Sequence, residues 1–302
     1  MRIAVIGAGA MGSIYGGHLS LHNDVYLVDT NQAIVDHINE NGLTVQEGGK
    51  DVVYHPTAVT STEGLEPMDL IILFVKALFS RSALGSNKGI IGPDTYLMTL
   101  QNGSGHEDIL SEFVPVNRII IGTTEDNGAV LAPGHVRRGG AGHTNIGMLE
   151  PDSDGFLPKL AEVLDSCGFQ GRIHDNIQQL IWDKLFTNVS LSAVTGVLQV
   201  PMGFIAGNEH AWNITRRLIH EAVEVAHGLG LTADEAAITE KVRSTSENSP
   251  EGITSIYADL RDGRKTEVNT ISGSVVRASQ KCGVPAPTHE LIVELVHAME
   301  ER

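Results

Sequence analysis

The chain lacks the features that mark secreted or membrane-spanning proteins. Its 302 residues include only two cysteines, Cys167 and Cys282, and neither lies in a CxxC or Cys/His spacing. We therefore expect reduced thiols, no metal site and a cytoplasmic protein. The apolar run after Met1 and Arg2 is too short for the core of a signal peptide. No stretch approaches the length of a membrane span, so we expect no membrane partner.

Positive charge is also scarce. The chain has 21 lysines and arginines against 37 aspartates and glutamates, which gives a formal net charge of -16. A surface this acidic repels phosphate backbones, and we expect no nucleic-acid partner. A small anionic substrate would need a local cationic pocket. Hydrophobic residues make up 41 % of the chain, which is enough to bury a core without help from metals or disulfides.

Strand-like segments are confined to the first part of the chain. Buried strands are expected over residues 3–6, 24–29, 69–76, 96–100 and 118–123, and a hairpin over 43–46 and 52–55. Helical segments separate several of these runs, and this alternation is typical of a parallel, doubly wound sheet. The glycine-rich stretch 128–148 is expected to extend that sheet with antiparallel strands.

After about residue 176 the strand signal vanishes. One helix is expected before this point, over residues 157–167. The helices expected after it cover residues 177–194, 210–229, 233–244, 254–260, 266–281 and 288–299. The chain is long enough to form two domains. We therefore predict an α/β protein with a Rossmann-type, doubly wound N-terminal domain over residues 1–174. A second, all-helical domain is predicted over residues 175–302.

A glycine-rich segment follows the first expected strand and opens the first expected helix. It consists of Gly7, Ala8, Gly9, Ala10, Met11 and Gly12. Gly7 permits a tight turn, Gly9 lets the backbone approach a pyrophosphate, and Gly12 lets the helix pack on the sheet. Amides at the helix N-terminus would then face the phosphates. The alternative is a glycine-rich turn without a ligand, but the strand–turn–helix context favours a dinucleotide site.

Asp29 ends the second expected strand, about twenty residues after the glycines. Its carboxylate can accept hydrogen bonds from the ribose hydroxyls of adenosine. The same charge would repel a 2′-phosphate, so Asp29 favours NAD(H) over NADP(H). The alternative role for Asp29 is to cap the next helix.

The helical region carries a polar stripe. Lys184, Asn188 and Ser192 are four residues apart and therefore share one face of a helix that is otherwise apolar. The stripe faces either water or a pocket, and the segment alone does not decide between them. Ser255 and Asp259 form a similar pair. Glu267 is expected in the first turn of the next helix, where the helix dipole favours its ionised form.

Several further motifs follow one another in order. They are Lys76 in LFVKA, Asn102-Gly103 in LQNGSG, the stretch GHVRRGGAGHTNIG, the helix residues Trp182, Lys184, Leu185 and Asn188, then Ser255 with Asp259, Thr266 with Glu267, and Gly283, Pro285 and Pro287. With the glycine loop, they resemble the ketopantoate reductase (2-dehydropantoate 2-reductase) family nearly end to end. Separated motifs in the right order are far more specific than any one of them.

The resemblance implies an oxidoreductase of pantothenate biosynthesis. Such an enzyme reduces 2-dehydropantoate, a small anionic 2-keto acid, to D-pantoate by hydride transfer from a nicotinamide cofactor. It implies that Lys184 is the general acid and that Glu267 supports catalysis. The residues implied to bind substrate are Asn102, Asn188, Ser192 and Ser255. Lys76 and Asn102 join the glycine loop and Asp29 as implied cofactor-binding residues.

Three departures from the family pattern leave alternatives open. Ser192 and Gly252 stand where the family often has substrate-side asparagines, and Asp29-Thr30 replaces the usual arginine. The first alternative is an NAD-dependent D-2-hydroxyacid dehydrogenase that acts on branched or aromatic 2-keto acids. NADP(H) also stays open, because Lys76 could meet a 2′-phosphate.

The second alternative is a non-catalytic NAD(H)-binding sensor, which the intact Lys184 and Glu267 disfavour. An apolar helix face in the second domain could form a homodimer contact.

Overall fold

The computed structural model describes residues 1–302, which form two compact units. The Rossmann unit contains Met1–Gln101 and His106–Ile177, and the helical unit contains Asn102–Gly105 and Gln178–Arg302. The sequence placed the domain boundary after residue 174. In the structure the chain passes into the helical unit after Ile177, and the short loop Asn102–Gly105 counts with the helical unit as well.

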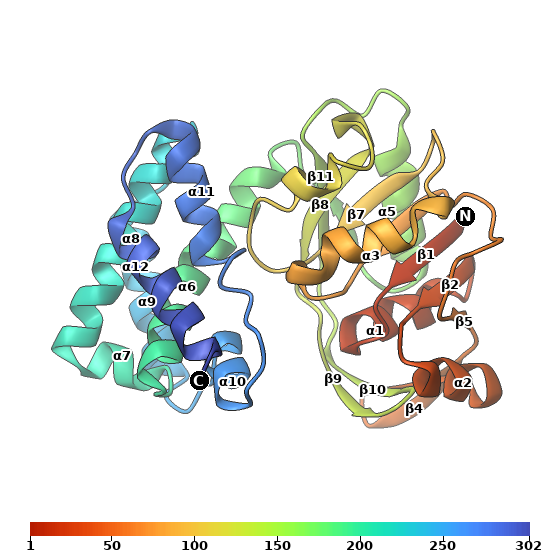
Figure 1. Ribbon diagram of the computed structural model, residues 1–302, viewed down its shortest axis with the longest axis horizontal. Coiled ribbons are helices and arrows are strands. Elements are labelled where there is room, and N and C mark those ends of the chain that lie inside the picture. Colours follow the sequence, from red (N-terminus) through yellow and green to blue (C-terminus); the bar gives the residue numbers. More distant parts are fainter. The chain divides into compact units, whose positions relative to one another are not determined.

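An eight-stranded sheet with the order β12-β11-β8-β7-β6-β1-β2-β5 forms the centre of the Rossmann unit (Figure 1). Its strands are β1 (Arg2–Ile6), β2 (Asp24–Val28), β5 (Thr57–Val59), β6 (Leu70–Leu73), β7 (Tyr96–Thr99), β8 (Ile119–Thr124), β11 (Thr144–Met148) and β12 (Gly171–Ile173). From β8 to β5 all neighbouring strands are parallel, while β11 runs antiparallel to β8. The predicted α/β class is confirmed. The three-residue strands β5 and β12 were missed because such short runs carry no periodic signal.

The parallel strands are apolar throughout because both faces of the sheet are covered. Ile3 and Val5 belong to the core on one face, and Ala4 between them is equally inaccessible to solvent. All four residues of β6 and of β7 are buried. Continuous apolar runs are typical of central strands in sheets of this kind.

A second, four-stranded sheet corrects one prediction. β3 (Leu43–Glu47) and β4 (Lys50–Tyr54) form the predicted hairpin, and they join β9 (Asn127–Ala132) and β10 (His135–Gly140) in the order β4-β3-β10-β9. The expectation that 128–148 would extend the main sheet is therefore right for β11 and wrong for β9 and β10. β9 pairs with β10, and the other partner of β10 is β3, which lies some ninety residues earlier and runs parallel to it. Periodicity within one segment cannot reveal a pairing this distant.

Helix α1 (Ala10–Leu19) contacts both sheets and is almost completely buried. This explains its lack of a polar face. The other helical elements of the Rossmann unit are α2 (Gln32–Asn41), η1 (Ala77–Phe79), α3 (Ser80–Ser86), η2 (Lys88–Ile90), α4 (Glu107–Leu110), η3 (Val116–Arg118) and α5 (Phe156–Ser166). Asn31 caps α2 by accepting a hydrogen bond from the Ala33 amide at 3.0 Å.

The helical unit is a bundle of helices (Figure 1). Its apolar core includes Trp182, Phe186 and Val223. Its helices are α6 (Ile177–Leu198), α7 (Gly203–Gly207), α8 (Glu209–Gly228), α9 (Glu235–Asn248), α10 (Ser255–Arg261), α11 (Ser272–Cys282) and α12 (Pro287–Glu300). The short α7 was not predicted. No helix of the chain combines the length and the apolar character that crossing a membrane requires.

The helix expected over residues 266–281 begins later than predicted. α11 starts at Ser272, and Glu267 lies in an irregular turn before it. The amide of Gly273 bonds to the carbonyl of Val268 at 2.8 Å, five residues back, which interrupts the regular helical pattern. Glu267 is therefore not in the first turn of a helix, and the dipole argument for its charge does not apply.

Candidate functional site

The glycine loop has the tight geometry that its sequence predicted. A Cβ at Gly12 would lie 1.8 Å from the carbonyl oxygen of Gly7, so only glycine lets α1 approach the loop this closely. Gly9 is exposed, and a Cβ there would meet no atom within 4 Å. The space above Gly9 is therefore open to a ligand, at the N-terminus of a helix where backbone amides favour anions.

A cavity of about 390 Å³ lies beside this loop. Its walls come from the carboxyl ends of β1, β2, β5 and β6, where the strand order of the sheet reverses. Gly7 and Asp29 line it, together with apolar side chains that include Val28, Val75 and Phe79. Ligands of doubly wound proteins bind at such a switch point, and the apolar walls suit the flat face of an adenine ring.

Asp29 is held in place by backbone amides. Its Oδ2 accepts a hydrogen bond from Ala8 at 2.8 Å, and its Oδ1 accepts one from Asn31 at 2.9 Å. Asn31, not Asp29, caps α2. The carboxylate thus connects the glycine loop with the end of β2 and still lines the cavity.

Polar side chains that the sequence reasoning missed complete the cavity. They are Thr30, Thr60, Ser61, Ser82, Ser86 and Asn87. Asn87 is buried and accepts a hydrogen bond from Thr62 at 2.8 Å. Ser82 and Ser86 are four residues apart on α3, and this helical spacing is the one signal that could have suggested these two. Lys76 follows the cavity-lining Val75 and is half-buried at the start of η1.

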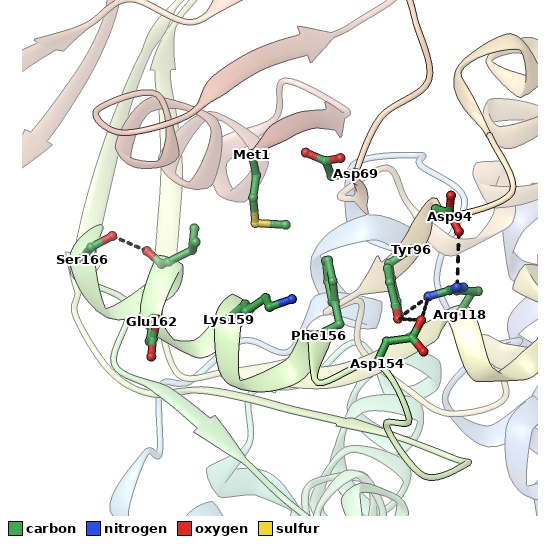
Figure 2. A pocket seen from close by; sticks show the side chains of 11 residues that line it. Met1, Asp69, Asp94, Tyr96, Arg118, Asp154, Phe156, Lys159, Glu162 and Ser166 are labelled. Atoms are coloured by element: carbon green, nitrogen blue, oxygen red, sulfur yellow. Dashed lines mark hydrogen bonds and ion pairs between the residues drawn. The ribbon is translucent and has the colours of Figure 1, made fainter.

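A second cavity, of about 590 Å³, lies at the opposite, amino edge of the same sheet (Figure 2). The Arg118 guanidinium lies 4.7 Å from the ring centre of Tyr96, which stacks on Phe156 at 3.7 Å. Arg118 also pairs with Asp154 and, at 3.5 Å, with Asp94. These contacts tie the starts of β7 and β8 to α5. We assign them a structural role, because ligands of parallel sheets bind at the carboxyl edge.

In the helical unit, the polar stripe of α6 runs from the surface into the interior. Lys184 is exposed, Asn188 is half-buried and Ser192 is 5 % exposed. A stripe that merely faced water would not end in a buried serine. The last part of it lies against α10, where a Cβ at Gly196 would come within 2.5 Å of Ile256.

Helix α10 places Ser255 beside this inner end of the stripe. Thr254, the N-cap of α10, lies 2.8 Å from Thr195 of α6 and donates to the carbonyl of Ser192 at 3.4 Å. The next residue, Ser255, is exposed. Asp259 is buried and pairs with Arg264 at 2.9 Å, so it stabilises the end of α10.

The Asn102-Gly103 loop lies against the turn that contains Glu267. The Ser104 amide donates to the carbonyl of Thr270 at 2.9 Å. Gly103 has a φ of +98°, and a Cβ on it would lie 2.0 Å from the same carbonyl oxygen. Thr270 in turn bonds through its amide to the carbonyl of Glu267 at 3.0 Å. Thr270 thus links the loop that contains Asn102 with the carbonyl of Glu267, although the two segments are remote in sequence.

Comparison with known proteins agrees with these features over the whole chain. The family model described as Ketopantoate reductase PanE/ApbA matches residues 3–151, and the model of its C-terminal part matches residues 176–300. A 2-dehydropantoate 2-reductase of Streptococcus pyogenes is 32 % identical over 302 residues, covering 99 % of this chain and 98 % of the relative. A relative of the same name from Pyrococcus horikoshii is also 32 % identical, with the same coverage.

Solved structures extend the comparison. The ternary structure of D-mandelate dehydrogenase with NADH and anilino(oxo)acetate has a TM-score of 0.89 and 33 % identity, covering 100 % of this chain and 98 % of that one. A PanE/ApbA family ketopantoate reductase from Ralstonia eutropha JMP134 has a TM-score of 0.89 and 26 % identity, covering 100 % and 99 %.

A Rossmann unit with a dinucleotide-type cavity, followed by a helical unit with a polar stripe, defines an oxidoreductase of the two-unit dehydrogenase class. Within that class, the chain belongs to the ketopantoate reductase family. The resemblance drawn from its motifs is confirmed.

Proposed function

We propose that this protein reduces 2-dehydropantoate to D-pantoate with NADH. The observation that supports this most directly is full-length similarity to 2-dehydropantoate 2-reductases, combined with the retained lysine, asparagine and glutamate of the family motifs. The cofactor supplies a hydride to the keto carbon of the substrate. The protein has to bind both molecules, exclude water and deliver one proton to the carbonyl oxygen.

The residues of the Rossmann unit fit a dinucleotide. The open space above Gly9 accommodates a pyrophosphate, and the cavity lined by Val28, Val75 and Phe79 accommodates adenosine. Asp29 would accept hydrogen bonds from the ribose hydroxyls and repel a 2′-phosphate. We therefore propose NADH as the preferred cofactor, in line with the NADH bound to D-mandelate dehydrogenase.

The helical unit carries the proposed proton donor. Lys184 would donate a proton from Nζ to the carbonyl oxygen as negative charge develops there, and its positive charge would attract the carboxylate of the substrate. Glu267 would hold the lysine or the substrate in position. Asn102, Asn188, Ser192 and Ser255 are the proposed hydrogen-bond partners of the substrate, and Lys76 and Asn102 the further partners of the cofactor.

A second candidate function is that of an NADH-dependent D-2-hydroxyacid dehydrogenase for branched or aromatic 2-keto acids. Position 252 favours it: a Cβ on Gly252 would lie 2.2 Å from the terminal methyl of Met202 and 2.9 Å from the carbonyl of Ser249. The family's substrate-side asparagine therefore has no room here without repacking. The similarity to D-mandelate dehydrogenase points in the same direction.

Steady-state kinetics with a panel of 2-keto acids distinguish the two functions. We would compare 2-dehydropantoate, 2-ketoisocaproate and phenylglyoxylate, each with NADH and NADPH. The proposal expects the highest kcat/KM for 2-dehydropantoate with NADH. Equal or higher kcat/KM for either other acid would replace it with the second candidate, and no turnover with any acid would indicate a sensor.

A further inference from the structure

The turn that contains Glu267 is held largely by residues outside it. Residues 262–271 connect α10 to α11 without regular secondary structure, and residues 265–271 of this segment form the turn around Glu267. Inside the turn, the carbonyl of Glu267 accepts hydrogen bonds from the amides of Thr270 and Ile271 at 3.0 and 3.1 Å. A short turn of this kind keeps one conformation only if its neighbours impose it. Those neighbours therefore decide where Glu267 points.

A buried carboxylate at the end of α12 holds the first part of the turn. Oε1 of Glu300 accepts hydrogen bonds from the amide and from the hydroxyl of Thr266, both at 2.7 Å. Its Oε2 lies 3.4 Å from Nζ of Lys265. The Glu300 side chain is 3 % exposed, so a lost partner would leave an uncompensated buried charge. Glu300 thus fixes the two residues that immediately precede Glu267.

The rest of the turn is held from two helices. His297, one helical turn before Glu300, lies 3.1 Å from Oε2 of Glu300 and 3.1 Å from Oδ1 of Asn269. Arg277 of α11 donates to the carbonyl of Asn269 at 2.7 Å. The turn is therefore contacted on both sides of Glu267, and Glu300 takes part in most of the contacts on the α12 side.

We propose that Glu300 is a positioning residue for catalysis: by holding Lys265 and Thr266, it places the Glu267 carboxylate for the reaction. This inference rests on the proposed function, in which Glu267 supports proton transfer. Glu300 itself touches neither substrate nor cofactor in this proposal. A displacement of about 1 Å at a catalytic group can lower a rate by about 10²-fold, so a distant anchor can have a large effect.

Two substitutions separate the contribution of the Glu300 charge from that of its hydrogen bonds to Thr266. In a Glu300→Gln variant, the amide oxygen can still accept both hydrogen bonds from Thr266. The amide nitrogen cannot accept from His297 or pair with Lys265. Glu300→Gln should therefore retain part of the function, whereas Glu300→Ala removes every contact. Glu301 is the matched control, because it is the next residue, is exposed and makes no ion pair.

The test measures the turn and the reaction separately. We would record amide hydrogen exchange of residues 265–271, and kcat and KM with NADH and the best 2-keto acid. Glu300→Ala is expected to exchange faster in this turn and to lose kcat by about 10-fold or more. Glu300→Gln should lie between Glu300→Ala and the wild type, and Glu301→Ala should match the wild type in both measurements.

A double-mutant cycle with Glu267→Gln tests whether Glu300 acts through Glu267. If it does, adding Glu300→Ala to Glu267→Gln lowers kcat little further, because the two effects are not additive. Additive losses, a normal kcat in Glu300→Ala, or unchanged exchange in the turn would each overturn the inference.

A wild type that reduces no 2-keto acid would instead defeat the proposed function, and hydrogen exchange would still decide whether Glu300 holds the turn. If Glu300→Ala does not fold, Glu300→Gln carries both measurements.

Discussion

The carboxylate of Asp29 is bonded to the glycine loop, since its Oδ2 accepts a hydrogen bond from the amide of Ala8 at 2.8 Å. Asp29, the residue that follows β2, therefore has two effects. It orders the loop that would bind the pyrophosphate, and it brings a negative charge to the cavity proposed for adenosine. Cofactor preference and loop order are consequently coupled at one side chain.

Neutralising Asp29 should shift the cofactor preference towards NADPH. In Asp29→Asn the side-chain oxygen can still accept from the loop, but the repulsion of a 2′-phosphate is gone. We expect the NADPH/NADH ratio of kcat/KM to rise about tenfold, which corresponds to about 1.4 kcal/mol. Asp24→Asn, at the other end of β2, is the control and should leave the ratio unchanged. An unaltered ratio in Asp29→Asn would rule out this role for Asp29.

Removing the Lys184 ammonium should slow the chemical step. General-acid catalysis contributes about 10²-fold or more, so Lys184→Ala should lower kcat by at least that factor. NADH affinity, measured by fluorescence titration, should change little, because the proposed adenosine and pyrophosphate contacts come from the Rossmann unit. Lys241→Ala, an exposed lysine on α9, serves as the control. Near-normal kcat in Lys184→Ala would remove this lysine from the mechanism.

The Asn102-Gly103 loop should not tolerate a side chain at Gly103. Its φ of +98° disfavours any L side chain, and a Cβ would lie 2.0 Å from the backbone oxygen of Thr270. Strain and overpacking together should cost Gly103→Ala about 2 kcal/mol or more in unfolding free energy. Gly89→Ala, where a Cβ meets nothing within 4 Å, should be close to neutral. Equal stability of the two variants in denaturant titrations would contradict the loop geometry described above.

The cluster at the amino edge of the sheet should affect stability and not catalysis. Arg118→Ala removes the guanidinium that covers Tyr96 and leaves Asp94 and Asp154 without their shared cationic partner (Figure 2). We expect a loss of about 1 kcal/mol in unfolding free energy, with kcat/KM unchanged. Arg81→Ala, which breaks an exposed pair with Glu112, should have a smaller effect. A large fall in kcat/KM for Arg118→Ala would assign this edge a functional role.

Acid should weaken the contact between Glu300 and the turn. Burial raises the pKa of Glu300, but the hydrogen bonds from Thr266 and the contacts with His297 and Lys265 outweigh it, so the pKa lies below its usual value. A carboxylate with a lowered pKa in the folded state stabilises the protein above its unfolded pKa of about 4.3, and this contribution is lost as pH falls through the folded value. The difference in Tm between wild type and Glu300→Gln should therefore shrink below about pH 4.

Thermal unfolding of both proteins from neutral to acid pH measures that difference. Other carboxylates with lowered pKa values, such as Glu112 and Asp262, are present in both proteins and cancel in the comparison. A difference in Tm that stays constant down to about pH 3 would show that the charge of Glu300 does not stabilise the fold.

Local patterns in the sequence determined much of this protein. The apolar runs predicted the central parallel strands, because such strands are buried on both faces. Gly7, Gly9 and Gly12 predicted the loop before α1, because the geometry of that loop depends on contacts within a few residues. The ordered motifs from Lys76 to Pro287 identified the family.

Only the tertiary structure decided the remaining features, because they depend on contacts between residues far apart in the chain. β10 pairs with β3 and creates a second sheet that no single segment indicates. The Glu267 segment is an irregular turn and not a helix, and the amide of Thr266 at its start donates to the carboxylate of Glu300, which lies 34 residues later in the chain. Local spacing could predict that Glu267 carries a charge near a helix, but long-range hydrogen bonds determine where that charge is held.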